Sequence, residues 1–393
     1  MLTNPMPEHM RKTAALYIHI PFCEQRCSYC DFYTVANRKN AIPGYVEALL
    51  KEIEVQAESE LWKRQQFSTV FFGGGTPSLL TADQLASILT AVRSRFRFIK
   101  SPEVSIEMNP GTANSEKLGE FHGAGINRLS IGAQSFFDDE LQQVERIHTA
   151  HDIDKTVVSA RKAGFQNLSL DLIFALPGQR PSRWKQNLEH AIALEPEHLS
   201  TYNLTIEKGT PLHRKVQEGT IKKATEWRER ALYNYTIDFL ENHNYAHYEI
   251  SNFAKPGRLS QHNYKYWDGS LYLGVGASAS TFTGTARLKN RANYVHYVDK
   301  INRGQLPIET TEMLTQEQRQ FEVIFLGLRL TEGIDIAAYD ATFKQPFMDA
   351  WKKQVQMLTA GSDPLCELHD NHLMLTRQGK YLCDTVCTAF LQY

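Results

Sequence analysis

Short apolar strands alternate with amphipathic helices through the first two hundred residues, and this alternation constrains the fold more than any other feature. It contains no hairpin signal, so it predicts right-handed βαβ units and a parallel sheet. Six such units predict a partial or full β/α barrel, in which functional residues lie at the carboxyl ends of the strands. The predicted strands are 16–20, 69–73, 104–107, 128–131, 168–173 and 199–204, and the predicted helices lie near 42–60, 81–96, 114–123, 138–145, 152–163 and 181–194.

The pattern changes after about residue 210. A long amphipathic helix is predicted near 224–243, followed by a loop rich in aromatic residues and glycine from Tyr248 to Phe282. The stretch 312–393 is typical of a separate small helical domain, and Leu373–Tyr381 predicts a short strand, a turn and a closing helix, as in winged-helix folds. The predicted organisation is an N-terminal segment (1–15), a barrel core (16–210), a linking helix with an aromatic and glycine-rich segment (211–305) and a C-terminal helical domain (306–393).

Composition excludes several classes of protein. The chain has 393 residues, 42% of them hydrophobic and 22% charged, which is enough for one large domain and a smaller one. The net charge of −1 gives no global attraction to nucleic acid or to an anionic membrane. The N-terminus lacks the apolar stretch of a signal peptide, and no apolar run approaches the ~20 residues of a membrane helix. We therefore expect a soluble, cytoplasmic protein without stable membrane insertion.

Three of the six cysteines, Cys23, Cys27 and Cys30, lie within eight residues, directly after the first predicted strand. In a reducing compartment such a cluster indicates metal ligands or redox groups. A structural zinc site needs a fourth ligand, and His19 is too close because it lies on the strand itself. Iron–sulfur clusters are held by thiolates in compact loops, and three thiolates leave one iron open to a further ligand. Cys366, Cys383 and Cys387 are expected to be small apolar core residues.

The spacing C-x3-C-x2-C with an aromatic residue before the third cysteine resembles the signature of the radical S-adenosylmethionine (SAM) superfamily. The flanking motifs resemble the coproporphyrinogen III oxidase-like branch, and within it most of all the HemW-type heme chaperones. The resemblance runs from about residue 15 to the C-terminus and implies a partial (β/α)6 radical SAM barrel with a [4Fe-4S] cluster. Its motifs are Tyr17–Phe22, Gly73–Leu79, Glu107–Pro110, Leu129–Phe136, Asp171–Gly178, Glu249–Ala254 and Gln261–Trp267.

The resemblance also implies a set of SAM contacts at successive strand ends. The glycine run after the second predicted strand lets the backbone approach a ligand without obstruction by a Cβ atom. A carboxylate can accept hydrogen bonds from ribose hydroxyls, and an arginine can hold the SAM carboxylate by a two-pronged contact. The implied contacts are Gly74, Gly75 and Thr76 to the amino group, Tyr29 to the adenine, and Tyr17, Glu107, Gln134, Arg146 and Asp171 to the rest of SAM.

The segment 261–267 combines a histidine with several aromatic side chains, which suits a porphyrin site, since imidazole can ligate the iron and aromatic rings can cover the macrocycle. The resemblance associates this H-N-x-x-Y-W motif with heme, so His262 is the expected ligand. The same aromatic residues could instead form a lid that seals the barrel mouth. Two residues depart from the family pattern: Gln261 stands where an arginine is expected, and Ser280 where a histidine often occurs.

Three functions remain open from the sequence. The first is a heme chaperone that binds the cluster, SAM and heme, takes electrons from a donor and delivers heme to apo-hemoproteins. The second is an oxygen-independent coproporphyrinogen III oxidase. The oxidase usually carries a cysteine where this chain has Phe32, and a long N-terminal extension where only 16 residues precede Tyr17, so both features favour the chaperone. The third is a scaffold with a structural cluster, which the intact SAM constellation disfavours.

Overall fold

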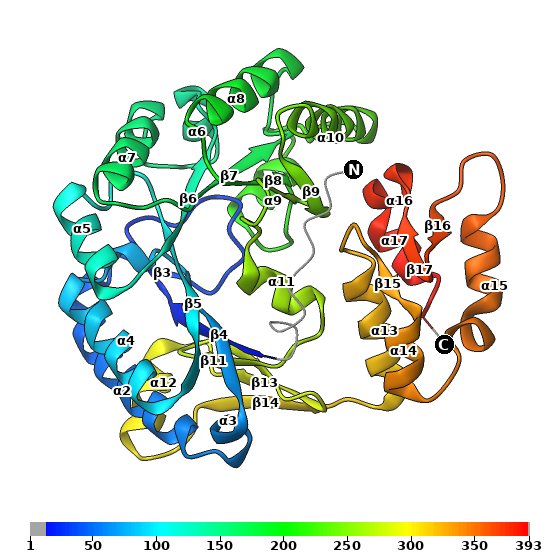
Figure 1. Cartoon of the computed structure of the whole chain (residues 1–393). Coiled ribbons are helices and arrows are strands. Elements are labelled where there is room, and N and C mark those ends of the chain that lie inside the picture. The colour runs from blue at the N-terminus through cyan, green and yellow to red at the C-terminus, as the bar shows by residue number, and fades with distance from the viewer. Residues whose placement is uncertain (1–12, 392–393) are drawn as a thin grey trace.

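The computed structural model describes residues 13–391 and contains a curved, twelve-stranded mixed sheet that forms an open barrel (Figure 1). Six neighbouring strands are parallel, and each coincides with a predicted strand. This confirms the βαβ units and the partial barrel. The six strands are β1 (Ala14–Ile20), β4 (Gln66–Gly74), β5 (Arg97–Met108), β6 (Arg128–Gln134), β7 (Leu168–Phe174) and β8 (His198–Asn203).

Amphipathic helices cover the outer face of this arc (Figure 1). Local signals set their ends: Thr81 forms a capping box with Gln84 at the start of α4, and Gly125 ends α5 with a φ of 104°. The helices of this layer are α2 (Ile42–Ala57), α3 (Glu60–Arg64), α4 (Ala82–Arg95), α5 (Ser115–Ala124), α6 (Asp138–Gln143), α7 (Ala150–Lys162), α8 (Pro181–Ala193) and α10 (Glu226–Glu241). The short helix α9 (Pro211–Gln217) lies against the cysteine loop, where the Leu212 N–H donates to the Ser28 carbonyl at 2.9 Å.

The segment from Tyr248 to Phe282, predicted as a loop, instead contains regular elements that extend the sheet at both edges. Each of these strands is too short for an alternating hydrophobic pattern to be recognised in the sequence. It forms because it pairs with an edge strand of the existing sheet. β11 (Tyr272–Val275) runs parallel to β1. The other elements are β9 (Ala246–Glu249), β10 (Asn252–Ala254), α11 (Gln261–Trp267), β12 (Ser280–Phe282), β13 (Ala286–Asn290) and α12 (Tyr294–Asn302).

The C-terminal part has its own apolar core and a three-stranded sheet in the order β15-β17-β16. The predicted strand, turn and closing helix are β17 and α16, and the three C-terminal cysteines are buried in this core, as expected. The elements are α13 (Gln316–Gly327), β15 (Ile334–Asp335), α14 (Ile336–Phe343), α15 (Phe347–Thr359), β16 (Cys366–His369), β17 (His372–Leu375), α16 (Arg377–Tyr381) and α17 (Cys383–Thr388).

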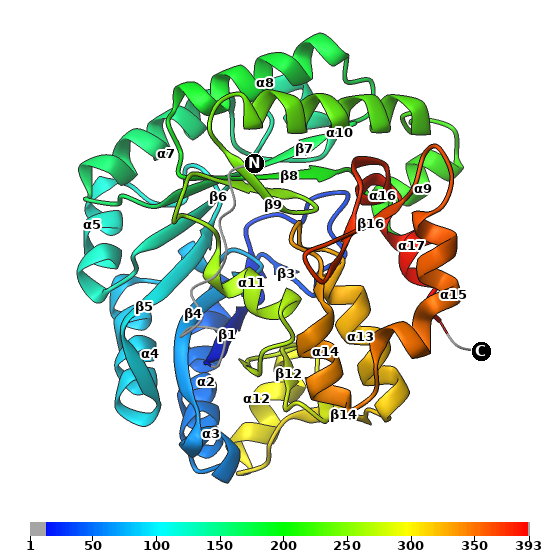
Figure 2. The same cartoon turned by 45° about the vertical axis from the view of Figure 1, so that its right-hand side comes forward.

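This C-terminal part lies at the open side of the arc, between α10 and β14 (Ile308–Met313) (Figures 1 and 2). β14 pairs with β13 in the main sheet. Residues 1–12 of the predicted N-terminal segment lie outside the described residues, and β1 begins at Ala14. Within residues 13–391, no helix is long and apolar enough to cross a membrane.

Candidate cofactor site and barrel cavity

The three clustered cysteines lie in the loop that leaves the carboxyl end of β1. The loop is fixed at its base, where β2 (Phe22–Cys23) pairs with β3 (Val35–Ala36). The Cys30 N–H donates to the Cys27 carbonyl at 3.2 Å, which turns the loop back on itself. Burial raises the pKa of the Cys23 thiol to about 11, and the nearby Cys30 and Cys27 add to this rise. The loop therefore collects three thiols that metal binding would have to deprotonate.

The donor set fits a cluster better than a single ion. Among residues 13–391, no three His, Cys, Asp or Glu side chains converge as ligands of one metal ion. Each iron of a cluster takes one thiolate, so a cluster does not require three sulfurs to meet at one point. The loop also lies at the strand end expected for a functional site of a β/α barrel. The cysteines thus suit a cluster with three protein ligands.

Polar groups from other strand ends support the thiols. The Thr76 hydroxyl donates to Cys23 Sγ at 3.6 Å, and Arg146 Nη1 lies 3.4 Å from Cys27 Sγ. Arg146 Nη2 donates to Asn109 Oδ1 at 2.8 Å and to the Gly132 carbonyl at 2.6 Å. Arg146 Nε is buried without a hydrogen-bond partner among the described residues. The guanidinium therefore lies beside a ligand thiol and keeps one buried donor for an acceptor such as a carboxylate.

The glycine run at the end of β4 is required by packing against β1 and the cysteine loop. A Cβ on Gly75 would lie 2.7 Å from the Phe22 carbonyl oxygen, and one on Gly74 would meet the His19 ring. Gly74 also has a φ of 111°, which side chains rarely adopt. The Gly75 and Thr76 N–H groups donate to the carbonyls of Ile20 and Phe22, both at 2.8 Å. The glycines thus hold the cysteine loop closely against β4.

Two buried carboxylates follow at the next strands. Glu107 accepts the Gly74 N–H at 3.0 Å, while Asp171 accepts the hydroxyls of Ser130 at 3.1 Å and Ser169 at 3.3 Å. Burial and the charge of Asp171 raise the pKa of Glu107 to about 7, and burial raises the pKa of Asp171. Near neutral pH, Glu107 can therefore donate or accept a hydrogen bond.

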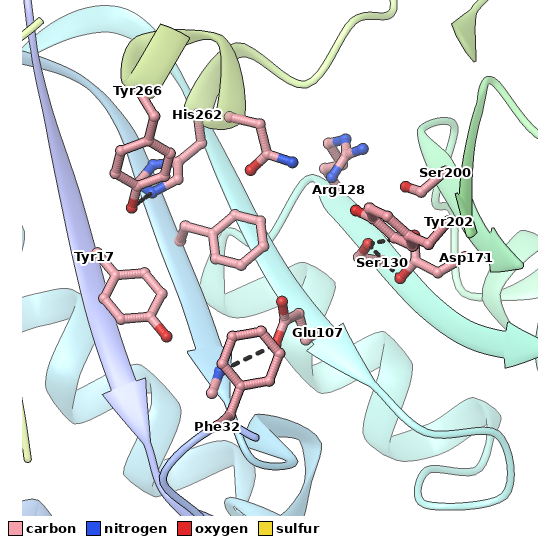
Figure 3. A pocket seen from close by; sticks show the side chains of 13 residues that line it. Tyr17, Phe32, Glu107, Arg128, Ser130, Asp171, Ser200, Tyr202, His262 and Tyr266 are labelled. Carbon is pink, nitrogen blue, oxygen red and sulfur yellow. Dashed lines mark hydrogen bonds between the residues drawn. The ribbon is translucent and has the colours of Figure 1, made fainter. Parts of the chain in front are cut away.

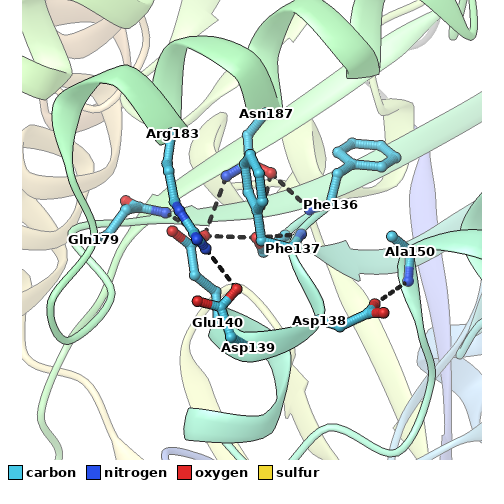
Figure 4. Close-up of polar contacts among 10 residues, drawn as sticks. Phe136, Phe137, Asp138, Asp139, Glu140, Ala150, Gln179, Arg183 and Asn187 are labelled. Carbon is cyan, nitrogen blue, oxygen red and sulfur yellow. Dashed lines mark hydrogen bonds and ion pairs between the residues drawn. The ribbon is translucent and has the colours of Figure 1, made fainter.

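Gln134 ends β6 in the left-handed region, with a φ of 65°. A buried network fixes the turn that follows it (Figure 4). Ser135 donates to Glu140 at 2.6 Å, and the Phe136 N–H donates to Asn187 Oδ1 at 2.6 Å. Sequence reasoning missed Glu140 and Asn187, because a polar residue on an amphipathic helix normally indicates the solvent face. Their contact with the 134–136 turn is visible only in the fold.

Tyr29, the expected adenine contact, packs under the cysteine loop rather than in the cavity wall. It lies against a small apolar cluster that includes Val144, Ile173 and Leu204. Burial raises the pKa of its hydroxyl. This packing anchors the loop, and the contact of Tyr29 with adenine stays a prediction.

His262 lies on α11, which packs against β4 and β1. Its Nδ1 is 2.8 Å from the Thr69 hydroxyl and its Nε2 is 3.0 Å from the Tyr266 hydroxyl (Figure 3). The ring stacks on Phe71 at 4.9 Å and is 1% exposed. The Glu103 carboxylate accepts the His262 N–H at 3.1 Å and so fixes the helix start. Burial lowers the pKa of His262 to about 3, so this imidazole is neutral.

The two departures from the family pattern have different places in the fold. Gln261 begins α11, and its backbone N–H donates to Glu103 at 3.2 Å. Ser280 begins β12, pairs with Lys289, and its carbonyl oxygen lies where a Cβ on Gly274 would stand. Ser280 therefore belongs to the sheet extension beside β11.

A cavity of about 290 Å³ extends from the cysteine loop to α11 inside the barrel (Figure 3). Phe32, which is 65% exposed, and Gly74 line it at the loop end, while His262 and Tyr266 line it at the α11 end. Of the expected SAM contacts, Tyr17, Gly74, Glu107 and Asp171 lie in this wall. Several of the lining residues belong to no motif that was identified in the sequence, so they were not predicted. The full lining is Tyr17, Phe32, Phe71, Gly74, Glu107, Arg128, Ser130, Asp171, Ser200, Tyr202, His262, Asn263 and Tyr266.

Comparison with known proteins agrees with this architecture. The family model described as the radical SAM superfamily matches residues 17–191, and the one described as the HemN C-terminal domain matches residues 314–382. Coproporphyrinogen III oxidase (HemN) from Escherichia coli superposes with a TM-score of 0.83 at 24% identity, covering 97% of this chain and 90% of that chain. At this level of identity the superposition shows a shared fold.

Two curated relatives match along almost their whole length. The protein named heme chaperone HemW from Bacillus subtilis (strain 168) is 35% identical over 380 residues, covering 95% of this chain and 98% of that protein. The protein of the same name from Lactococcus lactis subsp. lactis (strain IL1403) is 34% identical, covering 97% of this chain and 98% of that protein. The chain therefore belongs to the HemW family of the radical SAM superfamily.

Proposed function

We propose that the protein is a heme chaperone, which carries a [4Fe-4S] cluster and SAM and delivers heme to apo-hemoproteins. The observation that carries the proposal is the match to proteins named heme chaperone HemW over 95% and 97% of this chain. The three-thiol loop and the cavity beneath it supply the chemistry that such a protein needs. Free thiols that serve as cluster ligands also require a reducing compartment such as the cytoplasm.

In this proposal Cys23, Cys27 and Cys30 hold the cluster, and its open iron takes the amine and carboxylate of SAM. Together, the two groups supply one-electron and radical chemistry, for which an electron donor is needed. Thr76 and Arg146 hold the thiols through the contacts at 3.6 and 3.4 Å. The proposed SAM contacts are Tyr17, Tyr29, Gly74, Gly75, Thr76, Glu107, Gln134, Arg146 and Asp171.

Heme is the cargo, and His262 is its proposed axial ligand. The contacts of this side chain impose a condition on that role. Its Nε2 is bonded to the Tyr266 hydroxyl, and its ring is stacked on Phe71. Iron can bind this nitrogen only if the hydrogen bond breaks and α11 moves away from β4. Heme loading should therefore compete with the packing of α11.

Heme titration of three variants tests this ligand. His262→Ala should weaken the Soret band, whereas Tyr266→Phe should strengthen heme binding because it frees Nε2 at a gain of about 1 kcal/mol. Tyr245→Phe is the control, since its hydroxyl donates to the Pro196 carbonyl at 2.7 Å, away from α11. A Soret band that neither His262→Ala nor Tyr266→Phe changes would exclude His262 as the ligand.

Oxygen-independent coproporphyrinogen III oxidase activity is the second candidate, because the fold matches that enzyme over 97% of this chain. Phe32 stands in the loop where the oxidase usually has a cysteine, and this side chain is 65% exposed at the cavity mouth. Cluster-loaded protein, SAM, a reductant and coproporphyrinogen III should give no protoporphyrinogen IX. Sustained turnover would replace the chaperone proposal with the oxidase.

A further inference from the structure

The β16–β17 hairpin of the C-terminal part carries two histidines directly opposite each other (Figure 1). The strands are antiparallel, and His369 pairs with His372 at the end of the ladder. The connecting residues Asp370 and Asn371 have φ values of 46° and 63°, as a two-residue type I′ turn requires. Residues that pair directly across two strands lie on the same face, with Cβ atoms about 5 Å apart. The turn therefore holds two imidazoles side by side.

The two histidines lie on the face of this small sheet that points away from its apolar core. Successive strand residues alternate between the two faces, and Leu373 and Leu375 are buried in the core. The side chain of His369 is 67% exposed, and His372 is half-buried. An ion in solution can therefore reach both rings without any change in the fold.

Asp370 sets the tautomer of both rings. Its carboxylate lies 2.9 Å from His369 Nδ1, and its backbone carbonyl oxygen accepts from His372 Nδ1 at 3.0 Å. A carbonyl and an ionised carboxylate can only accept, so each neutral ring carries its proton on Nδ1 and its lone pair on Nε2. Across residues 13–391, neither Nε2 atom makes a hydrogen bond. This is the arrangement of metal-binding histidines, in which the second ring nitrogen donates to a carboxylate or a backbone carbonyl.

Carboxylates around the pair favour a cation. Asp335 on β15 pairs with His372, so three neighbouring strands place Asp335, His372 and His369 in one row. The Asp335 carboxylate also accepts the Ala338 N–H at 3.0 Å, which holds it at the start of α14. Glu367, two residues before His369 on the same face, is exposed. In the described part of the chain no three such side chains converge on one ion, so the protein supplies two ligands and water the others.

We propose that the hairpin binds a divalent transition-metal ion through Nε2 of His369 and Nε2 of His372. Imidazole suits Ni²⁺, Cu²⁺ and Zn²⁺, whereas Mg²⁺ and Ca²⁺ prefer oxygen ligands, and Cu²⁺ should bind most tightly. The ion links β16 to β17 and so stabilises the folded C-terminal part. The site shares no residue with the cysteine loop or with the cavity lining, so it does not depend on the proposed function.

Calorimetric titration of tag-free, cluster-loaded protein with Ni²⁺ tests the site, because the cluster occupies the loop thiols that would otherwise compete. One Ni²⁺ should bind, and His369→Asn or His372→Asn should each weaken binding at least about tenfold, since one arm of the chelate is lost. Asp370→Gly, which keeps the turn but removes the carboxylate, should weaken it roughly tenfold. His296→Asn is the control, because it removes the single exposed histidine of α12. Mg²⁺ should give no binding heat.

Two readouts separate a chelate from independent surface histidines. In a chelate, either single substitution removes the whole tight site, whereas independent histidines would leave one site of unchanged affinity. Ni²⁺ should also raise the melting temperature of the wild type and of His296→Asn, but not that of the hairpin variants. Without Ni²⁺ all of them should melt at the same temperature, because the substituted rings are not in the core. Affinity that survives either hairpin substitution, affinity lost in His296→Asn, or an equal response to Mg²⁺ would each overturn the proposal.

Discussion

The two ends of the barrel cavity are built in opposite ways. At the cysteine end, Cys27 and Cys30 are half-buried and the loop is held mainly by backbone contacts. At the α11 end, His262 is fully buried, and both ring nitrogens are hydrogen-bonded. Both ends looked like ligand sites in the sequence. In the structure, the half-buried Cys27 and Cys30 at the cysteine end can still meet a ligand. The two ring nitrogens of His262 are instead used in hydrogen bonds that close the barrel.

This contrast teaches that residue type alone does not identify an open site. A thiol in a tight loop has few competing partners, because the loop is too short to fold over it. A histidine on an amphipathic helix can turn inward and satisfy both nitrogens within the core. Substitutions at the two ends should therefore separate cofactor loading from stability.

The largest effect is expected for Cys27→Ala at the cysteine end. Reconstituted wild-type protein should hold about four irons, and the variant almost none, because three thiolates are needed for the cluster. The melting temperature of the apoprotein should change little, since Cys27 is half-buried. Cys387→Ala, in the C-terminal core, is the matched control and should keep the iron. Iron analysis that finds a full cluster in Cys27→Ala would refute the ligand assignment.

The opposite pattern is expected for His262→Ala at the α11 end. Iron content should be unchanged, while the free energy of unfolding should fall by about 2–4 kcal/mol because an aromatic core contact and two hydrogen bonds are lost. Denaturant unfolding of the apoprotein measures this difference. His296→Ala, on the exposed face of α12, should have almost no effect. If His262→Ala and His296→Ala have the same free energy of unfolding, the packing of His262 does not stabilise the closed barrel.

Glu107 connects the two ends and should make stability depend on pH. Its pKa is about 7 in the folded protein, against an ordinary value of 4.5, mainly through burial. As pH rises from about 4.5 to 7 the unfolded chain ionises first, so ionisation increasingly favours unfolding; below 4.5 both states are protonated and the effect vanishes. Glu107→Gln should therefore stabilise the apoprotein at pH 8 by about 2 kcal/mol and hardly at pH 4.5. If Glu107→Gln changes the free energy of unfolding equally at pH 8 and pH 4.5, Glu107 is not a buried carboxyl group that titrates between these two pH values.

The sequence predicted the features that depend on local patterns. The six parallel strands and the position of the cysteine loop follow from periodicity and spacing. It did not predict the sheet extension, because strands as short as β12 form only when an edge is available. It also missed Asn187, which reaches the 134–136 turn from another helix.

The smallest effects are expected for two threonines, one in β4 and one just after it. Their comparison also discriminates best between the two ends of the cavity. Thr69 contacts His262 Nδ1 at 2.8 Å, and Thr76 donates to Cys23 Sγ at 3.6 Å and accepts from Asn109 at 3.1 Å. Replacing either by valine should lower the free energy of unfolding by about 1 kcal/mol, because a buried hydrogen bond is lost. Only Thr76→Val should also lower the reduction potential of the cluster, since a hydrogen bond to a ligand sulfur favours the reduced state. Redox titration of both variants measures the difference. A shift in Thr69→Val as well would mean that the two ends of the cavity are coupled.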